Sequence, residues 1–295
     1  MSFVTKVGKY SLDRKGNHMR LHTVRTAAGL RAARQEQDEL VLLDATDVGA
    51  LLAESNWRDI AQGGGADRIA LLGADFAPVV PKPEKIICVG INYRSHAEET
   101  GLAIPDYPTI FAKYGRALIG ARDPIVLPRN SVKVDWEAEL AVVIGREVRY
   151  ADESEAEQAI AGYTVANDVS MRDWQARTNQ WLQGKTFEAS TPVGPALVTL
   201  DELDDPSNLR VSCDINGEVM QESWTNELIF SPAAIIAYVS GIITLAPGDV
   251  ILTGTPGGIG GRRTPPRFLK SGEVLRTTID GVGELVNVCI DDDGA

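Results

Sequence analysis

Short apolar runs with alternating polar positions dominate the chain, and turn-forming residues separate most of them. Helical spacing is confined to a few segments, and no regular alternation of strand and helix runs through the sequence. Asn216-Gly217 lies between two apolar runs and is a strong signal for a hairpin turn. The pattern predicts a β-rich α+β fold. Strands are expected at 19–24, 39–43, 85–90, 134–144, 163–166, 209–215, 249–253 and 284–290, and helices at 48–52, after Ser95 as N-cap, at 152–161 and at 231–240.

The chain divides into three stretches of different character. Residues 1–18 are polar and basic, and we interpret them as an extension or cloning remnant outside the fold. Residues 19–80 mix short strand and helix signals, which predicts a small N-terminal α+β domain. Prolines then punctuate the chain at positions 78, 81 and 83 and suggest a linker. Residues 81–295 are expected to form the main domain.

Charge and cysteine content narrow the partners and the compartment. The 295-residue chain has a formal net charge of −12 with no basic stripe to offset it, which argues against a nucleic-acid partner. No apolar run approaches a membrane span and the polar N-terminus lacks a signal-peptide core, so we expect no membrane association. Cys88, Cys213 and Cys289 are scattered in strand-like contexts, which favours buried thiols in a reducing cytoplasm.

Glu137 and Glu139 are two residues apart inside the predicted strand 134–144. Side chains at i and i+2 of a strand share a face, so the two carboxylates would lie side by side next to an apolar run. Crowded, partly desolvated anions need a proton or a cation, and a hard divalent metal suits their oxygen atoms. Asp168 follows a predicted strand and is the natural third carboxylate. The alternative is a solvated strand face, with Asp168 capping a turn.

Three other features could carry chemistry. His96 and Glu99 would share a helix face, so that the carboxylate could orient the imidazole as a general base toward water. A surface histidine beside ordinary acids is the alternative. Lys185 could meet an oxyanion or simply be solvated. The glycine-rich segment 252–260 lacks the spacing of nucleotide-binding loops; its backbone amides could hold a carboxylate, or it could be a structural turn.

Taken in order, these segments resemble the fumarylacetoacetate hydrolase family, in its bacterial acylpyruvate hydrolase-like form. The resemblance covers residues 85–290 and, loosely, the region 19–80. The matching segments are Val89–Tyr93 with His96 and Glu99, Asp135–Leu140, Gly162–Asp173, Gly184–Phe187, Pro192–Pro195 and Leu252–Pro256.

The resemblance implies a mixed β-sheet roll around a Mg²⁺ or Mn²⁺ site, usually in a homodimer, with 81–295 as the catalytic metal-binding domain. Ca²⁺ would also suit hard oxygen ligands. Some family members use a further aspartate at the metal; the nearest equivalent here is Asn92, so a fourth protein carboxylate is not expected. The implied roles are metal ligands for Glu137, Glu139 and Asp168, catalysis for His96, Glu99 and Lys185, and substrate contact for Arg172, Gln175 and Thr255.

The resemblance implies hydrolysis of the carbon–carbon bond in a 2,4-dioxo acid, an acylpyruvate such as fumarylpyruvate or a fumarylacetoacetate-like compound from aromatic catabolism. Pyruvate and a carboxylic acid would be released. The alternative on the same scaffold is a decarboxylase or isomerase of a 2-oxo acid, of the oxaloacetate or 2-hydroxyhepta-2,4-diene-1,7-dioate type. A metal-stabilised binding module without enzymatic activity is a third interpretation.

Overall fold

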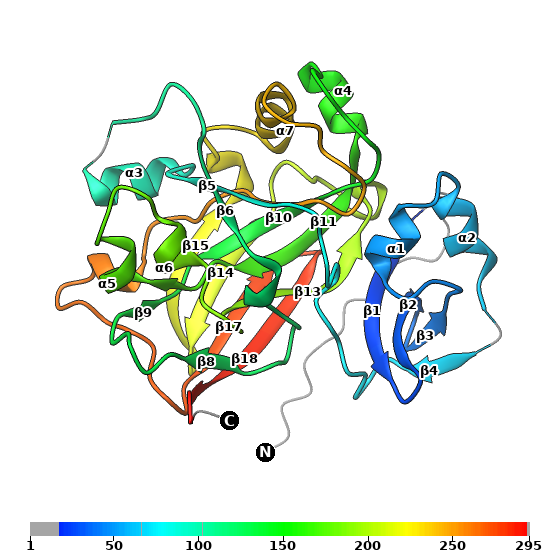
Figure 1. Ribbon diagram of the computed structural model, residues 1–295, viewed down its shortest axis with the longest axis horizontal. Helices are drawn as coiled ribbons and strands as arrows, with labels where there is room; N and C mark the ends of the chain where they lie inside the picture. Colours follow the sequence, from blue (N-terminus) through cyan, green and yellow to red (C-terminus); the bar gives the residue numbers. More distant parts are fainter. Residues whose placement is uncertain (1–17, 66, 102, 294–295) are drawn as a thin grey trace.

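Two β-sheets packed against each other form the body of the molecule (Figure 1). The computed structural model describes residues 18–65, 67–101 and 103–293, so almost all of the predicted extension 1–18 lies outside the described residues. Strand order is β4-β3-β2-β1-β13-β11-β10-β16-β5-β6 in the large sheet, with β7 beside β13, and β15-β14-β17-β18-β8 in the small one. Most pairs are antiparallel, while β16–β5, β13–β7 and β18–β8 are parallel. The β-rich, mixed-sheet α+β prediction is therefore confirmed.

The strands are short, as the spacing of turn signals predicts. They are β1 (Arg20–Thr26), β2 (Gly29–Glu36), β3 (Glu39–Leu42), β4 (Arg68–Ala70), β5 (Ile86–Gly90), β6 (Thr109–Lys113), β7 (Leu118–Ile119), β8 (Ile125–Leu127), β9 (Val134–Asp135), β10 (Ala138–Ile144), β11 (Ile160–Asn167), β12 (Ser170–Met171), β13 (Thr191–Val198), β14 (Arg210–Ile215), β15 (Glu218–Trp224), β16 (Val250–Leu252), β17 (Val274–Ile279) and β18 (Gly283–Asp291). The α-helices are α1 (Val48–Leu52), α2 (Trp57–Gly63), α3 (Arg94–Thr100), α4 (Glu153–Gln158), α5 (Arg172–Gln175), α6 (Leu182–Lys185) and α7 (Pro232–Ser240).

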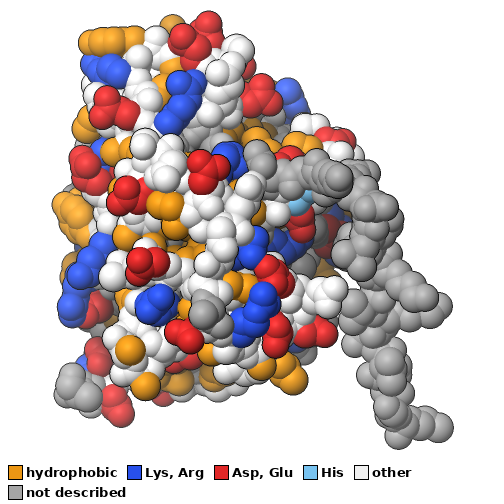
Figure 2. Space-filling view, turned by 90° about the vertical axis from the view of Figure 1, so that its right-hand side faces the viewer, with side chains coloured by type: hydrophobic (Ala, Val, Ile, Leu, Met, Phe, Trp, Pro, Cys, Tyr) orange, Lys and Arg blue, Asp and Glu red, His pale blue; other side chains and the backbone are white. Residues whose placement is uncertain are grey.

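The N-terminal unit, built from β1–β4, α1 and α2, lies at one side of the molecule (Figure 1). Its sheet is continuous with the large sheet because β1 pairs with β13. The proline-rich segment that follows is packed: Val79 and Val80 are buried, and the Val79 amide donates to the Val193 carbonyl. Figure 2 faces this unit and shows Lys and Arg side chains interspersed with Asp and Glu. Among the described residues, no helix combines the length and apolar character needed to cross a membrane.

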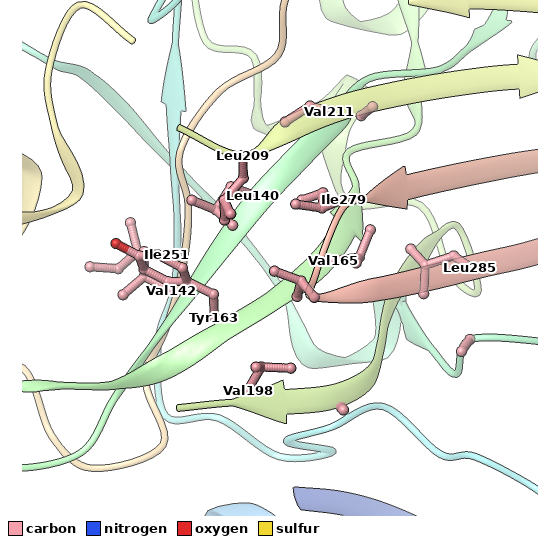
Figure 3. Packing of buried hydrophobic residues seen from close by; sticks show 14 of the residues in the cluster. Leu140, Val142, Tyr163, Val165, Val198, Leu209, Val211, Ile251, Ile279 and Leu285 are labelled. Atoms are coloured by element: carbon pink, nitrogen blue, oxygen red, sulfur yellow. The ribbon is translucent and has the colours of Figure 1, made fainter. Parts of the chain in front are cut away.

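Alternation along β10 divides the core into two layers. Leu140, Val142 and Ile144 belong to the apolar cluster shared with the small sheet, as Figure 3 shows for the first two. Ala141 and Val143 belong to a second cluster, which includes residues of β1 and of α1. Both faces of β10 are therefore covered, which explains its continuous apolar run.

Three local expectations need correction. The expected strand 134–144 is interrupted at Trp136-Glu137, because the chain changes pairing partner there. Helix α3 has Tyr93 at its N-cap position, so Ser95 lies inside the helix and is not its cap. The expected helix 152–161 ends at Gln158, and the following residues enter β11 as buried strand positions. The Asn216-Gly217 hairpin is confirmed between β14 and β15, with φ values of 52° and 85°.

We predict that Leu140→Ala destabilises the protein by about 2–5 kcal/mol, because a fully buried side chain between two sheets leaves a cavity that cannot collapse easily. Leu72→Ala is the matched control, since Leu72 is 94% exposed. Urea unfolding followed by fluorescence would measure both. Equal midpoints for the two variants would contradict the packing described for the core.

Candidate metal centre and active site

The candidate site begins where two neighbouring strands leave the large sheet together. β10 and β11 are paired up to Ala138 and Asn167. The segment before β10 and the segment after β11 then pair again, as β9 and β12. Glu137 and Asp168 lie in the aligned breaks, where the Asp168 amide donates to the Glu137 carbonyl at 2.8 Å. The Glu137 amide donates to Asn167 Oδ1 at 2.9 Å, which holds the break in shape. The break therefore places two acidic side chains at adjacent positions.

Glu137, Glu139 and Asp168 converge as the sequence predicts. Each offers a carboxylate oxygen, and these atoms all lie within 4.8 Å of one another. The three residues are 6%, 1% and 0% exposed, which excludes the alternative of a solvated strand face. Buried oxygen ligands at this spacing could hold a divalent metal ion.

Glu139 is the carboxylate least compensated by the protein. Burial raises its pKa well above the ordinary value, and the neighbouring Asp168 and Glu137 raise it further. Within the described residues its hydrogen-bond donor is the Gly254 amide, at 2.6 Å from Oε2. Glu137 differs: burial raises its pKa, but Lys185 and Arg172 outweigh burial and lower it to about 2. A cation between the carboxylates would relieve the charge at Glu139 most of all.

Three basic side chains surround the triad. Lys185 Nζ lies 2.6 Å from Glu137 Oε2 and 2.9 Å from Asp168 Oδ2. Lys113 Nζ lies 2.5 Å from Asp168 Oδ1, and Arg172 Nη1 lies 2.7 Å from Glu137 Oε1. Burial lowers the pKa of Lys185, but Asp168 and Glu137 outweigh burial and raise it overall, which keeps the ammonium protonated. The site can therefore donate hydrogen bonds to an anion.

The charge balance fits a divalent ion with an anionic ligand. Counting Asp135, which pairs with Arg172, four buried carboxylates face three cationic groups, so one negative charge remains when all four carboxylates are ionised. A divalent cation would reverse the sign and leave one positive charge, which suits a carboxylate substrate. The donor set thus fits a hard metal.

His96 and Glu99 meet as predicted, on one face of α3 with Nδ1 and Oε2 3.1 Å apart. The second Glu99 oxygen accepts from the Gly258 amide at 2.9 Å, which fastens α3 to the loop that follows β16. His96 is 8% exposed and is close enough to contribute to the low pKa of Glu137. Helices α3, α5 and α6 lie together on the side away from the N-terminal unit (Figure 1). The His96 imidazole therefore lies near the acidic triad.

The residues expected to contact substrate are found near the triad, and all three already have protein partners; those of Arg172 are Glu137, Asp135 and Gln175. Gln175 Oε1 accepts from Arg172 Nη1 at 2.9 Å, and Thr255 Oγ1 accepts from Gln221 Nε2 at 2.8 Å. Asn92 is a structural residue: its Nδ2 donates to the carbonyls of Phe230 and Thr253, and its Oδ1 accepts from the Phe230 amide at 2.7 Å. The substrate roles of Arg172, Gln175 and Thr255 stay predictions.

Sequence reasoning missed three buried polar residues of this site. Lys113 is the last residue of β6 and is 3% exposed. The sequence feature that could have identified it is a lysine at the end of a run with strand character. Asp135 lies two residues before Glu137 but was not singled out, although it is fully buried. Gln221 binds the Ala138 amide, Thr255 and the Pro256 carbonyl, and only the pairing of β14 with β15 reveals its position.

Comparisons with known proteins place the chain in a family. The model of the family described as fumarylacetoacetate (FAA) hydrolase C-terminal matches residues 85–290. The chain is 49% identical over 214 residues to the mitochondrial oxaloacetate tautomerase FAHD2A of Bos taurus, covering 72% of this chain and 68% of that protein.

Two solved structures are similar over nearly the whole chain. The 2-hydroxyhepta-2,4-diene-1,7-dioate isomerase of Mycobacterium marinum has a TM-score of 0.77 at 31% identity, covering 94% of this chain and 100% of its own. The fumarylacetoacetate hydrolase of Exiguobacterium antarcticum has a TM-score of 0.82 at 29% identity, covering 92% and 99%. Relatives with different reactions thus share this fold.

We predict that Glu139→Gln removes the response of stability to Mg²⁺ and Mn²⁺. In the wild type, metal at about 100 times its Kd should stabilise the fold by about 2.7 kcal/mol, measured by thermal unfolding. Because the pKa of Glu139 is raised on folding, the metal-free wild type should also lose stability as pH rises above 4.5, the ordinary value, and Glu139→Gln should lessen this loss.

The matched control for that measurement is Glu54→Gln, an exposed glutamate on the N-terminal unit. It should keep both the metal response and the pH dependence of the wild type. A wild-type protein whose unfolding midpoint is the same with and without divalent metal would contradict the metal assignment.

Proposed function

The chain belongs to the fumarylacetoacetate hydrolase C-terminal family, and from that premise we propose that it is a metal-dependent tautomerase of oxaloacetate or a closely similar 2-oxo dicarboxylic acid. The main support is the 49% identity over 214 residues to a protein named oxaloacetate tautomerase. The buried triad and its basic neighbours support the same reaction, since an enol and its ketone interconvert through an enolate that needs a cation and hydrogen-bond donors.

A bound Mg²⁺ or Mn²⁺ would act as a Lewis acid toward the 2-oxo group of the substrate. Lys185, kept protonated by Asp168 and Glu137, would donate a hydrogen bond to the enolate oxygen throughout the reaction. A water molecule would take the proton of the enol hydroxyl, and the neighbouring carbon would take up one proton from water, so that enol and ketone have the same composition. Arg172 would contact a substrate carboxylate, because its Nη2 atom is buried beside Glu137 and has no protein partner among the described residues.

Hydrolysis of an acylpyruvate is the second candidate, and the His96–Glu99 pair is the observation that favours it. With Nδ1 held by Glu99, the imidazole presents Nε2 as the remaining proton acceptor, which would allow it to deprotonate a water molecule. Tautomerisation cleaves no carbon–carbon bond and needs no activated water. Lys185 would stabilise the oxyanion in this reaction, with Gln175 as a second donor.

The oligomeric state, the partners, the cellular location and the metal are also proposals. A homodimer with a small 2-oxo acid as its only partner, and no nucleic acid or membrane, stays a prediction from the sequence. The expected cytoplasmic location stays a prediction too, because the tautomerase of Bos taurus that resembles this chain is named as mitochondrial. Magnesium is the metal we propose first, with manganese as the usual substitute.

The reaction type can be tested directly. With Mg²⁺, the purified protein should accelerate loss of the ultraviolet absorbance of enol-oxaloacetate without forming pyruvate. His96→Ala should retain measurable tautomerisation, because Lys185 and the metal site serve the enolate. Any acylpyruvate hydrolysis should fall about 10²–10⁴-fold in the same variant, since it loses its general base. Pyruvate release from acylpyruvates without tautomerisation would overturn the first proposal in favour of the second.

We further predict that Lys185→Ala lowers kcat for tautomerisation about 10²–10³-fold, because a buried donor to the enolate is lost. Lys185→Arg should recover only part of the activity, since a planar guanidinium cannot take the place of a compact ammonium between two carboxylates. Lys82→Ala, which removes an exposed lysine, is the control and should match the wild type. Unchanged kcat in Lys185→Ala would exclude the proposed role.

A further inference from the structure

One loop contacts three acidic residues in and around the site. Residues 254–261, called here the glycine loop, follow β16 and hold three protein carboxylates through backbone amides. The Gly254 amide binds Glu139 and the Gly258 amide binds Glu99, as described above. The amides of Gly260 and Gly261 bind Asp135 Oδ1 and Oδ2 at 2.7 and 2.9 Å. The sequence suggested that these amides could hold a carboxylate, and the carboxylates they bind are those of protein side chains.

Asp135 is saturated by these contacts. It is fully buried, and its two oxygens also accept from the Trp136 amide at 2.8 Å and from Arg172 Nε at 2.7 Å. Because both oxygens point to the glycine loop and to Arg172, they are not free to contact a metal or a substrate. Asp135 thus acts on the site through other residues.

Arg172 is the group that Asp135 holds toward the triad. Its Nε is bound to Asp135, and its Nη1 to Glu137 and Gln175. Nη2 is buried and has no hydrogen-bond partner among the described residues. The guanidinium is thus held at Nε and Nη1 and has one free donor, Nη2, so it is preorganised to bind an anionic oxygen. A buried donor without a partner carries a desolvation cost, and a ligand that pairs with it removes that cost.

We propose that Asp135 is a positioning residue, which orients the free donor of Arg172 toward a carboxylate of the substrate and couples that orientation to the glycine loop. The proposal rests on the proposed oxo-acid chemistry of this site. Through Gly258 the same loop also supports Glu99 and thereby His96. A change at Asp135 should therefore weaken anion binding first, while the three metal-binding carboxylates stay in place.

Two glycines make this contact possible. A Cβ at Gly260 would lie 2.0 Å from the Arg267 carbonyl oxygen and 2.7 Å from Asp135 Oδ1, so no larger residue fits there. A Cβ at Gly261 would lie 3.2 Å from Asp135 Oδ2 and 3.6 Å from Arg172 Cγ. Alanine at position 261 would press on the Asp135 carboxylate and only touch Arg172, without altering any charge, which makes it a useful second probe.

The experiment measures binding of oxalate to the Mg²⁺-loaded protein by titration calorimetry, in the wild type, Asp135→Asn, Arg172→Ala and the double variant. Asp135→Asn puts an amide nitrogen opposite donors that need an acceptor, so it should weaken oxalate binding about tenfold, with Mg²⁺ affinity changed less than about twofold. Arg172→Ala should weaken oxalate binding at least as much. In the double variant, loss of Asp135 should add nothing further, because its effect passes through Arg172.

Gly261→Ala should weaken oxalate binding in the same direction by a smaller factor, and it keeps the test open if Asp135→Asn does not fold. Gly115→Ala is its control, because a Cβ at Gly115 meets nothing within 4 Å. Additive effects in the double variant, or wild-type oxalate affinity in Gly261→Ala, would overturn the positioning role, as would a Mg²⁺-loaded wild type that does not bind oxalate. Oxalate binding with the expected coupling but no turnover of oxaloacetate would overturn the proposed function alone.

Discussion

Repulsion among buried carboxylates is the constraint on which this molecule's site depends. The aligned breaks that follow β9 and β11 bring Glu137 and Asp168 together, and alternation along the strand adds Glu139. None of the three can be solvated by bulk water, because the two sheets and the surrounding helices bury them. Each negative charge must be compensated locally or protonated. The surrounding structure consists largely of groups that supply this compensation.

The three carboxylates are compensated by different numbers of protein groups, and Glu139 has the fewest. Asp168 is paired with two lysines, and Glu137 with a lysine and an arginine. Glu139 has a single backbone amide among the described residues, and its pKa is raised well above the ordinary value. A divalent ion placed among the three oxygens would therefore act mainly on Glu139, and would compete with Lys185 for the other two carboxylates.

Much of this site could be predicted from the sequence, because its parts are local. The acidic pair and the His96–Glu99 pair follow from strand and helix periodicity, which needs only neighbouring residues. The strand break at Trp136-Glu137 could not be predicted in this way, since it arises from a second pairing of Asp135 with the distant Ser170. Lys113 was missed for the same reason, as a buried partner 55 residues from Asp168. The glycine-rich segment was recognised as a possible carboxylate holder, but the identity of its carboxylates depends on tertiary contacts.

The two candidate reactions place the same demands on the acidic triad and differ in whether they need the neighbouring His96. Tautomerisation and hydrolytic cleavage both require stabilisation of an enolate, so the roles proposed for the carboxylates, Lys185 and Arg172 apply to either reaction. Hydrolysis additionally requires a positioned water, and therefore a rigid His96. Helix α3 carries that residue and is held at both ends, by the Tyr93–Leu228 bridge at its start and by the bond between Glu99 and Gly258. A small displacement of α3 would move the imidazole while Glu137, Glu139 and Asp168, which lie on other segments of the chain, keep their positions, so both candidate reactions are compatible with one arrangement of the acidic triad.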